Sequence, residues 1–484
     1  MILLIIGGMF VGILFGALPG LTNVMGIVLF LPFTFDMSLY EALVLLGAIY
    51  GGAVYGGAIT AILINIPGAP ANIATCFDGF PMALKGEAKE ALSLAVLCST
   101  IGGLLGVFAL IFLSPQLAAI ALKFGPPEKF WVMVFSLSVI VALSAESLAK
   151  GIIAGSFGLL LATVGMPPDV GTEPRFLFGT YQFVGGINVV CALIGYFAFS
   201  QCIDMFSTNL NIATTITNID NKVGFSKIFR ILMAKYKFNL LRSSILGVII
   251  GIIPGAGGSV ASIISYNEAK RFARNPDDYG KGEWGGVIAS EAANNATEGG
   301  ALIPMLSLGI PGSPAAAAFV AALIIHGVWP GPALFIQHLD TVYTLFAGLI
   351  IAQIVMLFMG HFGAQYFSLA LKIPKNLLGM MVIILCLFGS YTVSNNMAGV
   401  YVMFATGILG FIGQKVGIPP APVVLGLILS KETEAALMQS IEIGQAKGSL
   451  LFYLFSSPLC VLLFALVLAS FTYVIYRRLK KSKS

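Results

Sequence analysis

The segment from Ser290 to Gly300 concentrates oxygen-bearing side chains directly before an apolar run. On a helix, Glu291, Asn294 and Glu298 fall at positions i, i+3 and i+7 and therefore share one face. Carboxylate, amide and hydroxyl oxygens suit a hard cation such as Na⁺, and a carboxylate can instead carry a proton. The pattern predicts a coupling-ion site formed by Glu291, Asn294, Asn295 and Glu298. The alternative is an interfacial turn whose carboxylates are solvated.

Four proline–glycine pairs interrupt the apolar sequence, at Pro19-Gly20, Pro67-Gly68, Pro254-Gly255 and Pro311-Gly312. Proline ends a helix, and glycine lets the chain turn and approach a ligand closely. The helical arm that follows each break begins with unpaired N–H groups, which form a natural anion receptor. The predicted substrate-binding residues are Gly20, Thr22, Asn23, Gly68, Asn72, Gly255, Gly257, Ser259, Gly312 and Ser313. Close packing between helices is the alternative use of such glycines.

The composition indicates the surroundings in which these residues must work. Of 484 residues, 58% are hydrophobic and 10% are charged, whereas about a quarter are charged in soluble domains. A membrane-spanning helix needs about 20 apolar residues, and about a dozen apolar runs approach that length. They cover 1–18, 42–66, 91–113, 130–143, 151–165, 184–203, 285–310, 315–335, 341–371, 377–393, 397–413 and 449–476. We therefore expect an all-α polytopic membrane protein with about 12 membrane segments.

The positions of the charges suggest the orientation of the chain. Residues 1–35 carry no charge, whereas a signal peptide begins with a basic region, so Met1 is expected to start the first membrane element. Lysine and arginine cluster at 204–242 and again at 477–484. By the positive-inside tendency, both segments are predicted to be cytoplasmic, one as a connector and one as a tail.

An internal duplication divides the chain into membrane repeats at 1–203 and 243–476. Gly12-Ile-Leu-Phe-Gly-Ala-Leu-Pro-Gly20 recurs 235 residues later as Gly247-Val-Ile-Ile-Gly-Ile-Ile-Pro-Gly255. Pro67-Gly-Ala-Pro70 recurs 244 residues later as Pro311-Gly-Ser-Pro314. Two further matches follow in the same order, 121–123 with 370–372 and 155–168 with 407–420. Repeats of this kind meet at the substrate site in many transporters.

The charges beside the first and third breaks predict that the two repeats are inverted. The arms around Pro254-Gly255 have Lys and Arg residues on both flanks, which indicates a re-entrant hairpin entered from the cytoplasm. The arms around Pro19-Gly20 lead to Asp36 and Glu41 with no Lys or Arg nearby, which indicates a hairpin entered from outside. A kink in one long tilted helix is the alternative for each pair.

Enzyme signatures are absent from the sequence. It contains no H-E-x-x-H, no Walker G-x4-G-K-[ST] and no G-x-S-x-G, and its three histidines lack ligand spacing. The six cysteines lie in or beside apolar runs and are expected to be small packing residues. We therefore predict no catalytic residues, no metal site, no cofactor beyond a coupling ion and no nucleic-acid partner.

An ordered set of motifs from about residue 7 to 430 resembles the large membrane subunit of the tripartite tricarboxylate transporters. The motifs are Gly16-Ala-Leu-Pro-Gly-Leu-Thr22, Tyr50-Gly-Gly-Ala-Val-Tyr-Gly-Gly57, Asn65-Ile-Pro-Gly-Ala-Pro-Ala71, Asp78-Gly-Phe-Pro-Met-Ala83, Pro254-Gly-Ala-Gly257, Ser290-Glu-Ala-Ala-Asn-Asn-Ala296 and Leu308-Gly-Ile-Pro-Gly-Ser313. The resemblance implies a translocating subunit that works with a small membrane subunit and a periplasmic solute-binding protein. It also implies an inner-membrane location, organic carboxylate substrates such as citrate, and energy from a Na⁺ or H⁺ gradient.

Three functions remain to be compared. The first is a secondary carboxylate transporter in which the breaks of both halves bind the anion near the middle of the membrane. The second is a passive carboxylate channel or exporter, in which substrate would move down its own gradient without a binding protein. The third, an intramembrane enzyme, is disfavoured because no nucleophile–base pair or metal-ligand set is visible.

Overall fold

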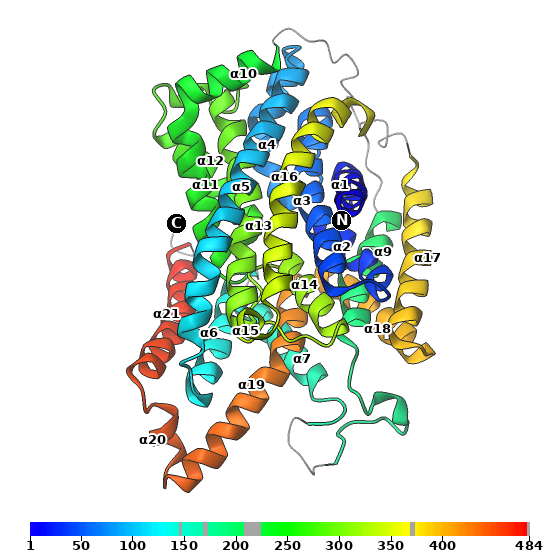
Figure 1. Cartoon of the computed structure of the whole chain (residues 1–484), viewed down its shortest axis with the longest axis vertical. Helices are drawn as coiled ribbons and strands as arrows, with labels where there is room; N and C mark the ends of the chain where they lie inside the picture. Colours follow the sequence, from blue (N-terminus) through cyan, green and yellow to red (C-terminus); the bar gives the residue numbers. More distant parts are fainter. Residues whose placement is uncertain (145–147, 168–172, 208–223, 368–372, 482–484) are drawn as a thin grey trace. The chain divides into compact units, whose positions relative to one another are not determined.

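The structure is a computed structural model that describes residues 1–144, 148–167, 173–207, 224–367 and 373–481 (Figure 1). Over these residues all regular elements are helices, and the only extended pairing is an isolated bridge between Gly165 and Arg175. Parts of three sequence predictions lie outside the described residues: 208–223 of the basic connector, 482–484 of the tail, and the repeat positions Pro168 and 370–372. The all-α prediction is confirmed.

Seven helices of the described ranges are long and apolar enough to cross a membrane. They are Leu39–Ile64, Ala88–Ala121, Pro126–Leu143, Val189–Ser207, Leu339–Ala364, Asn376–Ser394 and Met397–Lys415. Five shorter apolar helices accompany them, at Ile2–Ala17, Asn23–Thr34, Leu148–Ala162, Pro314–Ile325 and Pro458–Thr472. The apolar run at 315–335 thus contains a helix of only 12 residues, and the run at 449–476 is divided after Leu454. By length and composition these helices fit a multi-pass membrane protein, and the figure of 12 segments stays a prediction.

The chain forms two compact units, and each draws on both halves of the sequence. Unit 1 contains Met1–Gln116 and Gln201–Leu385, and unit 2 contains Leu117–Ser200 and Cys386–Ser484. The units therefore divide the chain differently from the proposed repeats, whose boundaries stay a prediction. All the predicted site residues belong to unit 1.

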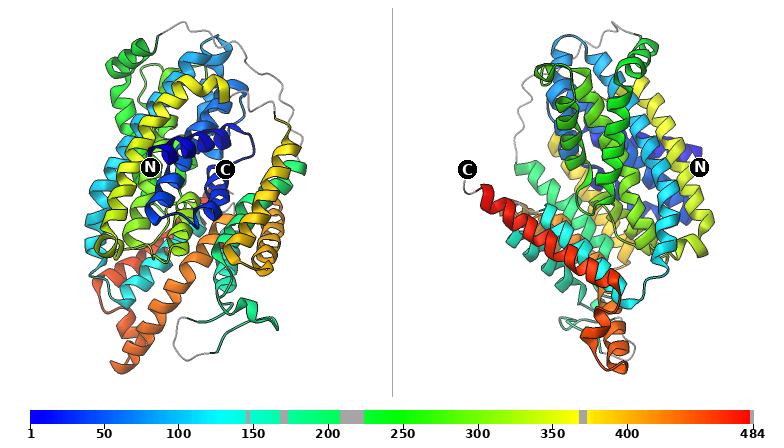
Figure 2. Two further views of the ribbon diagram at one scale, coloured as in Figure 1. Left: turned by 45° about the vertical axis from the view of Figure 1, so that its right-hand side comes forward. Right: turned by 90° about the vertical axis from the view of Figure 1, so that its left-hand side faces the viewer.

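Unit 1 contains the elements around all four proline–glycine breaks. Its helices are α1 (Ile2–Ala17), α2 (Asn23–Phe30), α3 (Leu39–Ile64), α4 (Ile73–Leu84), most of α5 (Ala88–Ala121), α9 (Ser200–Ser207), α10 (Phe225–Ile231), α11 (Lys237–Ile252), α12 (Gly257–Arg271), α13 (Trp284–Leu308), α14 (Pro314–Ile325), α15 (Leu334–Gln337), α16 (Leu339–Phe367) and the first half of α17 (Lys375–Ser394). Short turns η1 (Leu31–Thr34) and η2 (Pro70–Asn72) precede α3 and α4. Figure 2 shows these elements from two further sides.

The first and third breaks adopt the same backbone turn. Leu21 N donates to Leu18 O at 3.0 Å, and Ala256 N donates to Ile253 O at 3.2 Å. The glycine within each turn has a positive φ, 92° at Gly20 and 81° at Gly255. Proline followed by such a glycine is the signature of a type II turn. These breaks are therefore true turns and not the kinks that the sequence left open.

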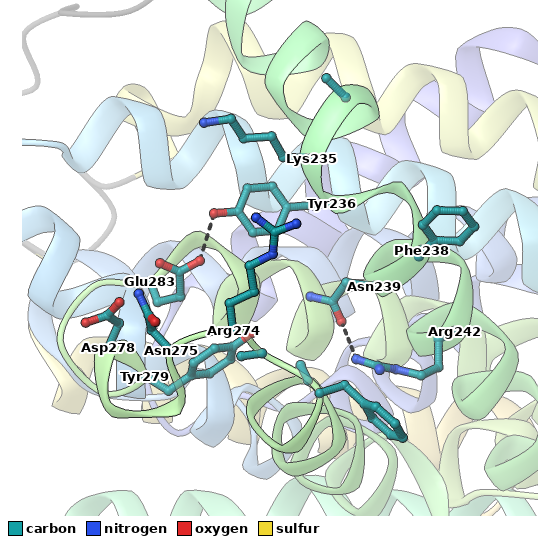
Figure 3. A pocket seen from close by; sticks show the side chains of 14 residues that line it. Lys235, Tyr236, Phe238, Asn239, Arg242, Arg274, Asn275, Asp278, Tyr279 and Glu283 are labelled. Carbon is teal, nitrogen blue, oxygen red and sulfur yellow. Dashed lines mark hydrogen bonds between the residues drawn. The ribbon is translucent and has the colours of Figure 1, made fainter.

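The arms that follow these two turns fold back along a long helix. In the third break, α11 and α12 form an antiparallel pair against α13 (Figure 1). At the open end of this pair, the Arg242 guanidinium lies 4.9 Å from the Phe272 ring, and the Tyr236 hydroxyl donates to Glu283 at 2.8 Å (Figure 3). Both arms of the first break pack against α3. A Cβ at Gly26 of α2 would lie 3.4 Å from Ile49 of α3, and a Cβ at Gly16 of α1 would collide with Ala53, one turn further along α3.

The second and fourth breaks also correspond to one another. Helix α3 ends at Asn65 and α13 ends at Gly309, both in the left-handed conformation that commonly ends helices. After each end, the glycine of the break donates its N–H to the preceding long helix, Gly68 to Gly57 O at 3.4 Å and Gly312 to Ala301 O at 3.3 Å. Gly68 packs against the backbone of Gly16 in α1, and Gly312 packs against the backbone of Gly251 in α11. The same local geometry thus occurs twice, at the positions where the sequence matches.

Each short helix after these breaks contacts the loop that precedes the long helix of the other half. Asp78 of α4 is fully buried and accepts hydrogen bonds from the N–H groups of Gly280, Gly282 and Glu283, all at 2.8 Å. His326, at the end of α14, lies 3.0 Å from Thr34 O. We refer to these two contacts as the crossed clamps.

Replacing Asp78 with alanine is expected to lower the stability of unit 1 by about 2 kcal/mol, because hydrogen bonds to a charged acceptor exceed ordinary ones in strength. The Tyr266 hydroxyl also donates to Asp78, at 2.9 Å. Tyr266→Phe removes that one bond and keeps the ring, so we expect a loss of about 1 kcal/mol. Thermal unfolding in detergent compares the two variants, and equal midpoints for Asp78→Ala and wild type would contradict the clamp.

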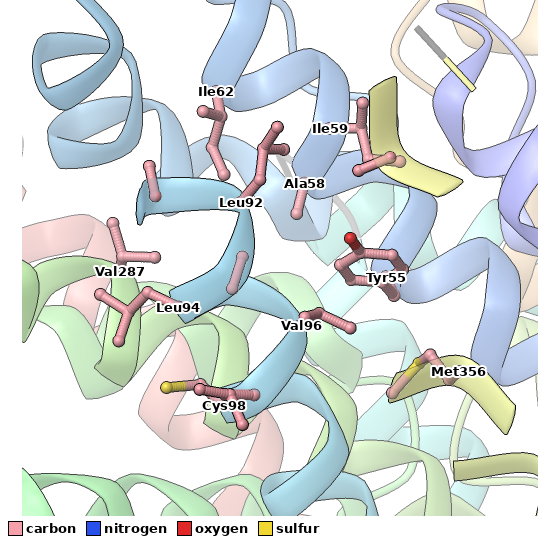
Figure 4. Packing of buried hydrophobic residues seen from close by; sticks show 14 of the residues in the cluster. Tyr55, Ala58, Ile59, Ile62, Leu92, Leu94, Val96, Cys98, Val287 and Met356 are labelled. Carbon is pink, nitrogen blue, oxygen red and sulfur yellow. The ribbon is translucent and has the colours of Figure 1, made fainter. Parts of the chain in front are cut away.

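The core of unit 1 is an apolar cluster between α3, α5, α13 and α16 (Figure 4). Tyr55 and Ile59 of α3 meet Val96 of α5 and Met356 of α16 there. The six cysteines all lie in the described ranges, where they form no disulfide, and five of them are buried, as expected for packing residues.

Unit 2 is built around the long helix α19 (Pro420–Ala446). Its other helices are the end of α5, α6 (Pro126–Ser144), α7 (Leu148–Ala162), α8 (Val189–Leu193) with the π-helical η4 (Ile194–Phe199), the end of α17, α18 (Met397–Lys415), α20 (Leu450–Leu454) and α21 (Pro458–Lys481). Close packing joins α7 to α19, since a Cβ at Gly426 would lie 2.7 Å from Gly155 O. Arg175 pairs with Glu434 through two hydrogen bonds of 2.8 and 3.1 Å.

Candidate functional site

The acidic and amide residues near position 295 lie in the middle of a long buried helix. Helix α13 begins after Glu283, whose side chain accepts from Gly285 N, and it ends at Gly309. The exposed fractions of Glu291 and Glu298 are 0% and 2%. The alternative of an interfacial turn with solvated carboxylates is therefore wrong. Carboxylates inside a membrane protein are costly and mark ion or substrate paths.

Hydroxyl groups from two other helices surround Glu291. Thr75 of α4 donates to its Oε1, and Ser99 of α5 donates to its Oε2 at 2.9 Å. The Thr75 hydroxyl also lies 3.1 Å from Ser290 Oγ. One carboxylate and three hydroxyls therefore meet at a fully buried point. This is a set of oxygen ligands that suits a hard cation, and the carboxylate alone could hold a proton.

A second polar site surrounds Glu298, two turns further along α13. Gln353 of α16 is buried and donates its Nε2 to Glu298 Oε2 at 3.2 Å. Glu298 Oε1 and Gln353 Oε1 are both buried without a hydrogen-bond partner. Seven residues correspond to about 10 Å of helix, so Glu291 and Glu298 form two separate sites. Each site has its own neighbours.

The two asparagines of the motif occupy different positions. Asn294 faces the tip of the α11–α12 hairpin, which is the second hairpin in chain order. A Cβ at Gly258 in this tip would collide with Asn294 Oδ1, and Asn294 Nδ2 has no partner. Asn295 donates Nδ2 to Glu291 O at 3.1 Å, and its Oδ1 is buried without a partner. Unpaired buried amide groups are rare in proteins and call for an explanation such as a bound ion or ligand.

Contacts within unit 1 link the breaks to one another in pairs. Gly255 N donates to Gly312 O at 3.0 Å, which joins the third break to the fourth. A Cβ at Gly258 would lie 3.2 Å from Ala71, which places the tip of the second hairpin beside the second break. Gly68 of the second break packs directly against the carbonyl oxygen of Gly16, in the helix that leads into the first break. The predicted residues from both halves are thus gathered within unit 1.

Two predicted polar residues at the breaks, Thr22 and Ser313, cap the helices that follow, and Asn23 bonds to its neighbour in the chain. Thr22 accepts from Met25 N at 3.3 Å, Asn23 from Val24 N at 2.9 Å and Ser313 from Ala316 N at 3.1 Å. Ser313, Asn72, Gly68 and Gly312 are buried. The remaining positions are half-buried: Gly20, Thr22, Asn23, Gly255, Gly257 and Ser259. Asn72 donates to Val54 O at 3.3 Å, and its Oδ1 has no partner.

Three neighbours of the carboxylates were not among the predicted site residues, and neither was Tyr50. Gln353, Ser99 and Thr75 contact them directly, and Tyr50 lies 3.5 Å from Ser313 Oγ. Gln353 is the one polar side chain in the stretch 345–360. That isolation is the only signal that could have singled it out.

Comparison with known proteins assigns the chain to a family. The model of the tripartite tricarboxylate transporter TctA family matches residues 2–425. The chain is 33% identical over 467 residues to an uncharacterized 52.8 kDa protein in the TAR-I ttuC′ 3′ region of Agrobacterium vitis, covering 96% of this chain and 90% of that protein. It is 32% identical over 203 residues to an uncharacterized protein in the TAR-II ttuC′ 3′ region of the same organism, covering 42% of this chain and 84% of that protein. No solved structure matches. The chain, with its multiple membrane helices, belongs to the TctA family of tripartite tricarboxylate transporters.

Proposed function

We propose that this chain is the translocating subunit of a secondary transporter that takes up tricarboxylates or related organic carboxylates across the inner membrane. Family membership supports a membrane subunit for such substrates. A periplasmic solute-binding protein would deliver the carboxylate, and a small membrane subunit would complete the assembly. The observation that supports the proposal is the pair of buried carboxylates on α13, a helix whose neighbours include the α11–α12 hairpin and the residues of the second and fourth breaks.

The anion would be bound by backbone N–H groups at the starts of the helices that follow the breaks. Helices α2 and α14 begin beside the first and fourth breaks, and α4 and α12 begin beside the second and third. The positive ends of their dipoles favour a carboxylate without any lysine or arginine at the breaks. The remaining negative charge of a di- or trianion would be offset by co-transported cations.

The cations would bind at Glu291 and Glu298, where carboxylate oxygens are combined with hydroxyl and amide groups. Asn294 lies on the same helix beside the tip of the second hairpin. A cation bound on α13 would therefore stabilise the same arrangement of hairpin and helix that binds the anion. This shared element provides a physical basis for coupling an ion gradient to carboxylate uptake.

The two halves would act as inverted repeats that open the site to alternate sides. The repeated turns and repeated helix ends support duplication. Lysine and arginine flank the α11–α12 hairpin and are absent around the first hairpin, which supports opposite orientations.

Reconstitution in liposomes tests the proposal. We expect the chain, its small membrane partner and a carboxylate-loaded binding protein to accumulate labelled carboxylate only when a Na⁺ or proton gradient is imposed. Dissipating the gradient with an ionophore is the control, and it should abolish accumulation. Uptake that is unchanged without a gradient and without binding protein would instead identify a passive channel or exporter.

A further inference from the structure

A cleft of about 870 Å³ lies at the open end of the α11–α12 hairpin, away from the carboxylates of α13 (Figure 3). Its lining comes from the start of α11 with the preceding turn, from the end of α12, and from the loop before α13. Three cationic side chains line it, Lys235, Arg242 and Arg274. Nothing in the proposed transport cycle uses this cleft.

The floor of the cleft is fixed by hydrogen bonds. Arg242 Nη2 donates to Asn239 Oδ1 at 3.0 Å, and Asn239 Nδ2 donates to Gly285 O at 2.9 Å. The Arg242 guanidinium is also held against the Phe272 ring. These two contacts hold the guanidinium in place, and its Nε is buried without a hydrogen-bond partner.

Cations exceed carboxylates around the cleft. Asp278 and Glu283 are the acidic lining residues, and Glu283 Oε1 already accepts from Tyr236 and Gly285 N. Lys235 and Arg274 form no ion pair within the described part of the chain. Burial raises the pKa of Tyr279 to about 12, so its hydroxyl stays a neutral donor at physiological pH. The cleft is therefore suited to an anion.

An exposed apolar stripe leads away from the cleft along α11. Phe238, Leu241, Ile245 and Ile249 follow helical spacing and are all exposed, Phe238 to 77%. Phe272, 66% exposed, adds a second aromatic ring at the cleft. Such a stripe faces hydrocarbon in a membrane protein, and aromatic rings gather where hydrocarbon meets the headgroups. The cationic cleft therefore lies at one end of a surface that lipid chains would cover.

We propose that this cleft binds the headgroup phosphate of an anionic glycerophospholipid whose acyl chains lie along the exposed face of α11. The guanidinium groups of Arg242 and Arg274 and the ammonium of Lys235 contact the phosphate. A planar guanidinium matches phosphate oxygens well, and basic pockets beside membrane helices bind acidic headgroups. The bound lipid links α11, α12 and the loop before α13 and thereby fixes the base of the second hairpin.

Native mass spectrometry of the purified chain in detergent tests this site, with phosphatidylglycerol, phosphatidylethanolamine and inorganic phosphate added separately. We expect phosphatidylglycerol adducts to be retained, and to be weakened about tenfold by Arg274→Gln or Lys235→Gln. Both substituted residues are exposed, so these variants should fold. Lys237→Gln is the matched control, because Lys237 is an exposed cation in the same segment that does not line the cleft.

A thermal-shift series gives an independent measurement. Phosphatidylglycerol should raise the unfolding midpoint of wild type and of Lys237→Gln, and should raise that of Arg274→Gln much less. Equal retention of phosphatidylethanolamine, or equal losses in Lys237→Gln and Arg274→Gln, would overturn the proposal. Displacement of the lipid by millimolar inorganic phosphate would overturn it in favour of a soluble anion.

Discussion

Glu291→Gln is expected to lower gradient-driven carboxylate uptake by about a hundredfold, the upper part of the usual range for coupling between two sites. Glutamine keeps the size of the side chain and can still accept a hydrogen bond from Thr75 or Ser99. It removes the negative charge that a cation or proton would neutralise at this fully buried point. Uptake into liposomes, measured as initial rate against imposed Na⁺ or proton gradient, provides the readout.

The control for this prediction is Glu268→Gln. Glu268 lies in α12 and pairs with the exposed Arg271 at 3.4 Å, so its charge is screened by solvent and its loss should leave uptake unchanged. Normal gradient-driven uptake by a folded Glu291→Gln protein would remove Glu291 from the coupling site. In that case, loss of gradient-driven uptake in Glu298→Gln would assign the coupling to the second carboxylate, which lies beside Gln353.

Gly68→Ala is expected to destabilise the protein by about 3 kcal/mol or more, as over-packing does at rigid sites. The added Cβ would lie 2.6 Å from the Cα of Gly57 and even closer to the carbonyl oxygen of Gly16. Both are backbone atoms of packed helices, so neither can rotate away. Yield after detergent extraction and the thermal unfolding midpoint measure the effect.

Gly7→Ala is the matched control for this substitution. Gly7 lies in α1, and a Cβ there would meet no atom within 4 Å. Alanine at an open helical position should leave stability unchanged or raise it by up to about 1 kcal/mol. If Gly68→Ala and Gly7→Ala unfolded at the same temperature, the second break would not be packed against the first hairpin as the structure shows.

The breaks could be predicted from the sequence because their cause is local. Proline followed by glycine specifies a type II turn within four residues, and both such turns occur at Pro19 and Pro254. The helical face of Glu291, Asn294 and Glu298 was predicted for the same reason, since it depends only on the spacing of residues within one helix.

The partners of that face could not be predicted, because they come from distant segments. Ser99 and Gln353 lie 192 and 55 residues from the carboxylates they contact. Each lies within a predominantly apolar run, and the sequence does not show which way its side chain faces. Helix α19 was missed for a different reason: Lys431, Glu432 and Glu434 interrupt its apolar character.

The division into units also could not be read from the duplication. Repeats describe which segments descend from one ancestral sequence, whereas units describe which segments pack together. Here α4 contacts α13 and α2 contacts α14, so segments from the two halves share one core. Contacts of this kind depend on the packing of both halves at once.

The crossed clamps have a consequence for the synthesis of the chain. When the first half leaves the ribosome, Asp78 lacks its three backbone donors, because Gly280, Gly282 and Glu283 have not yet been made. Thr34, in the segment before α3, likewise lacks its contact with His326 until the second half has been made. The crossed clamps can therefore form only after both halves have been synthesised, that is, after translation has passed α14. Two half-length polypeptides expressed together contain both partners of each clamp, whereas either one by itself contains only one partner of each.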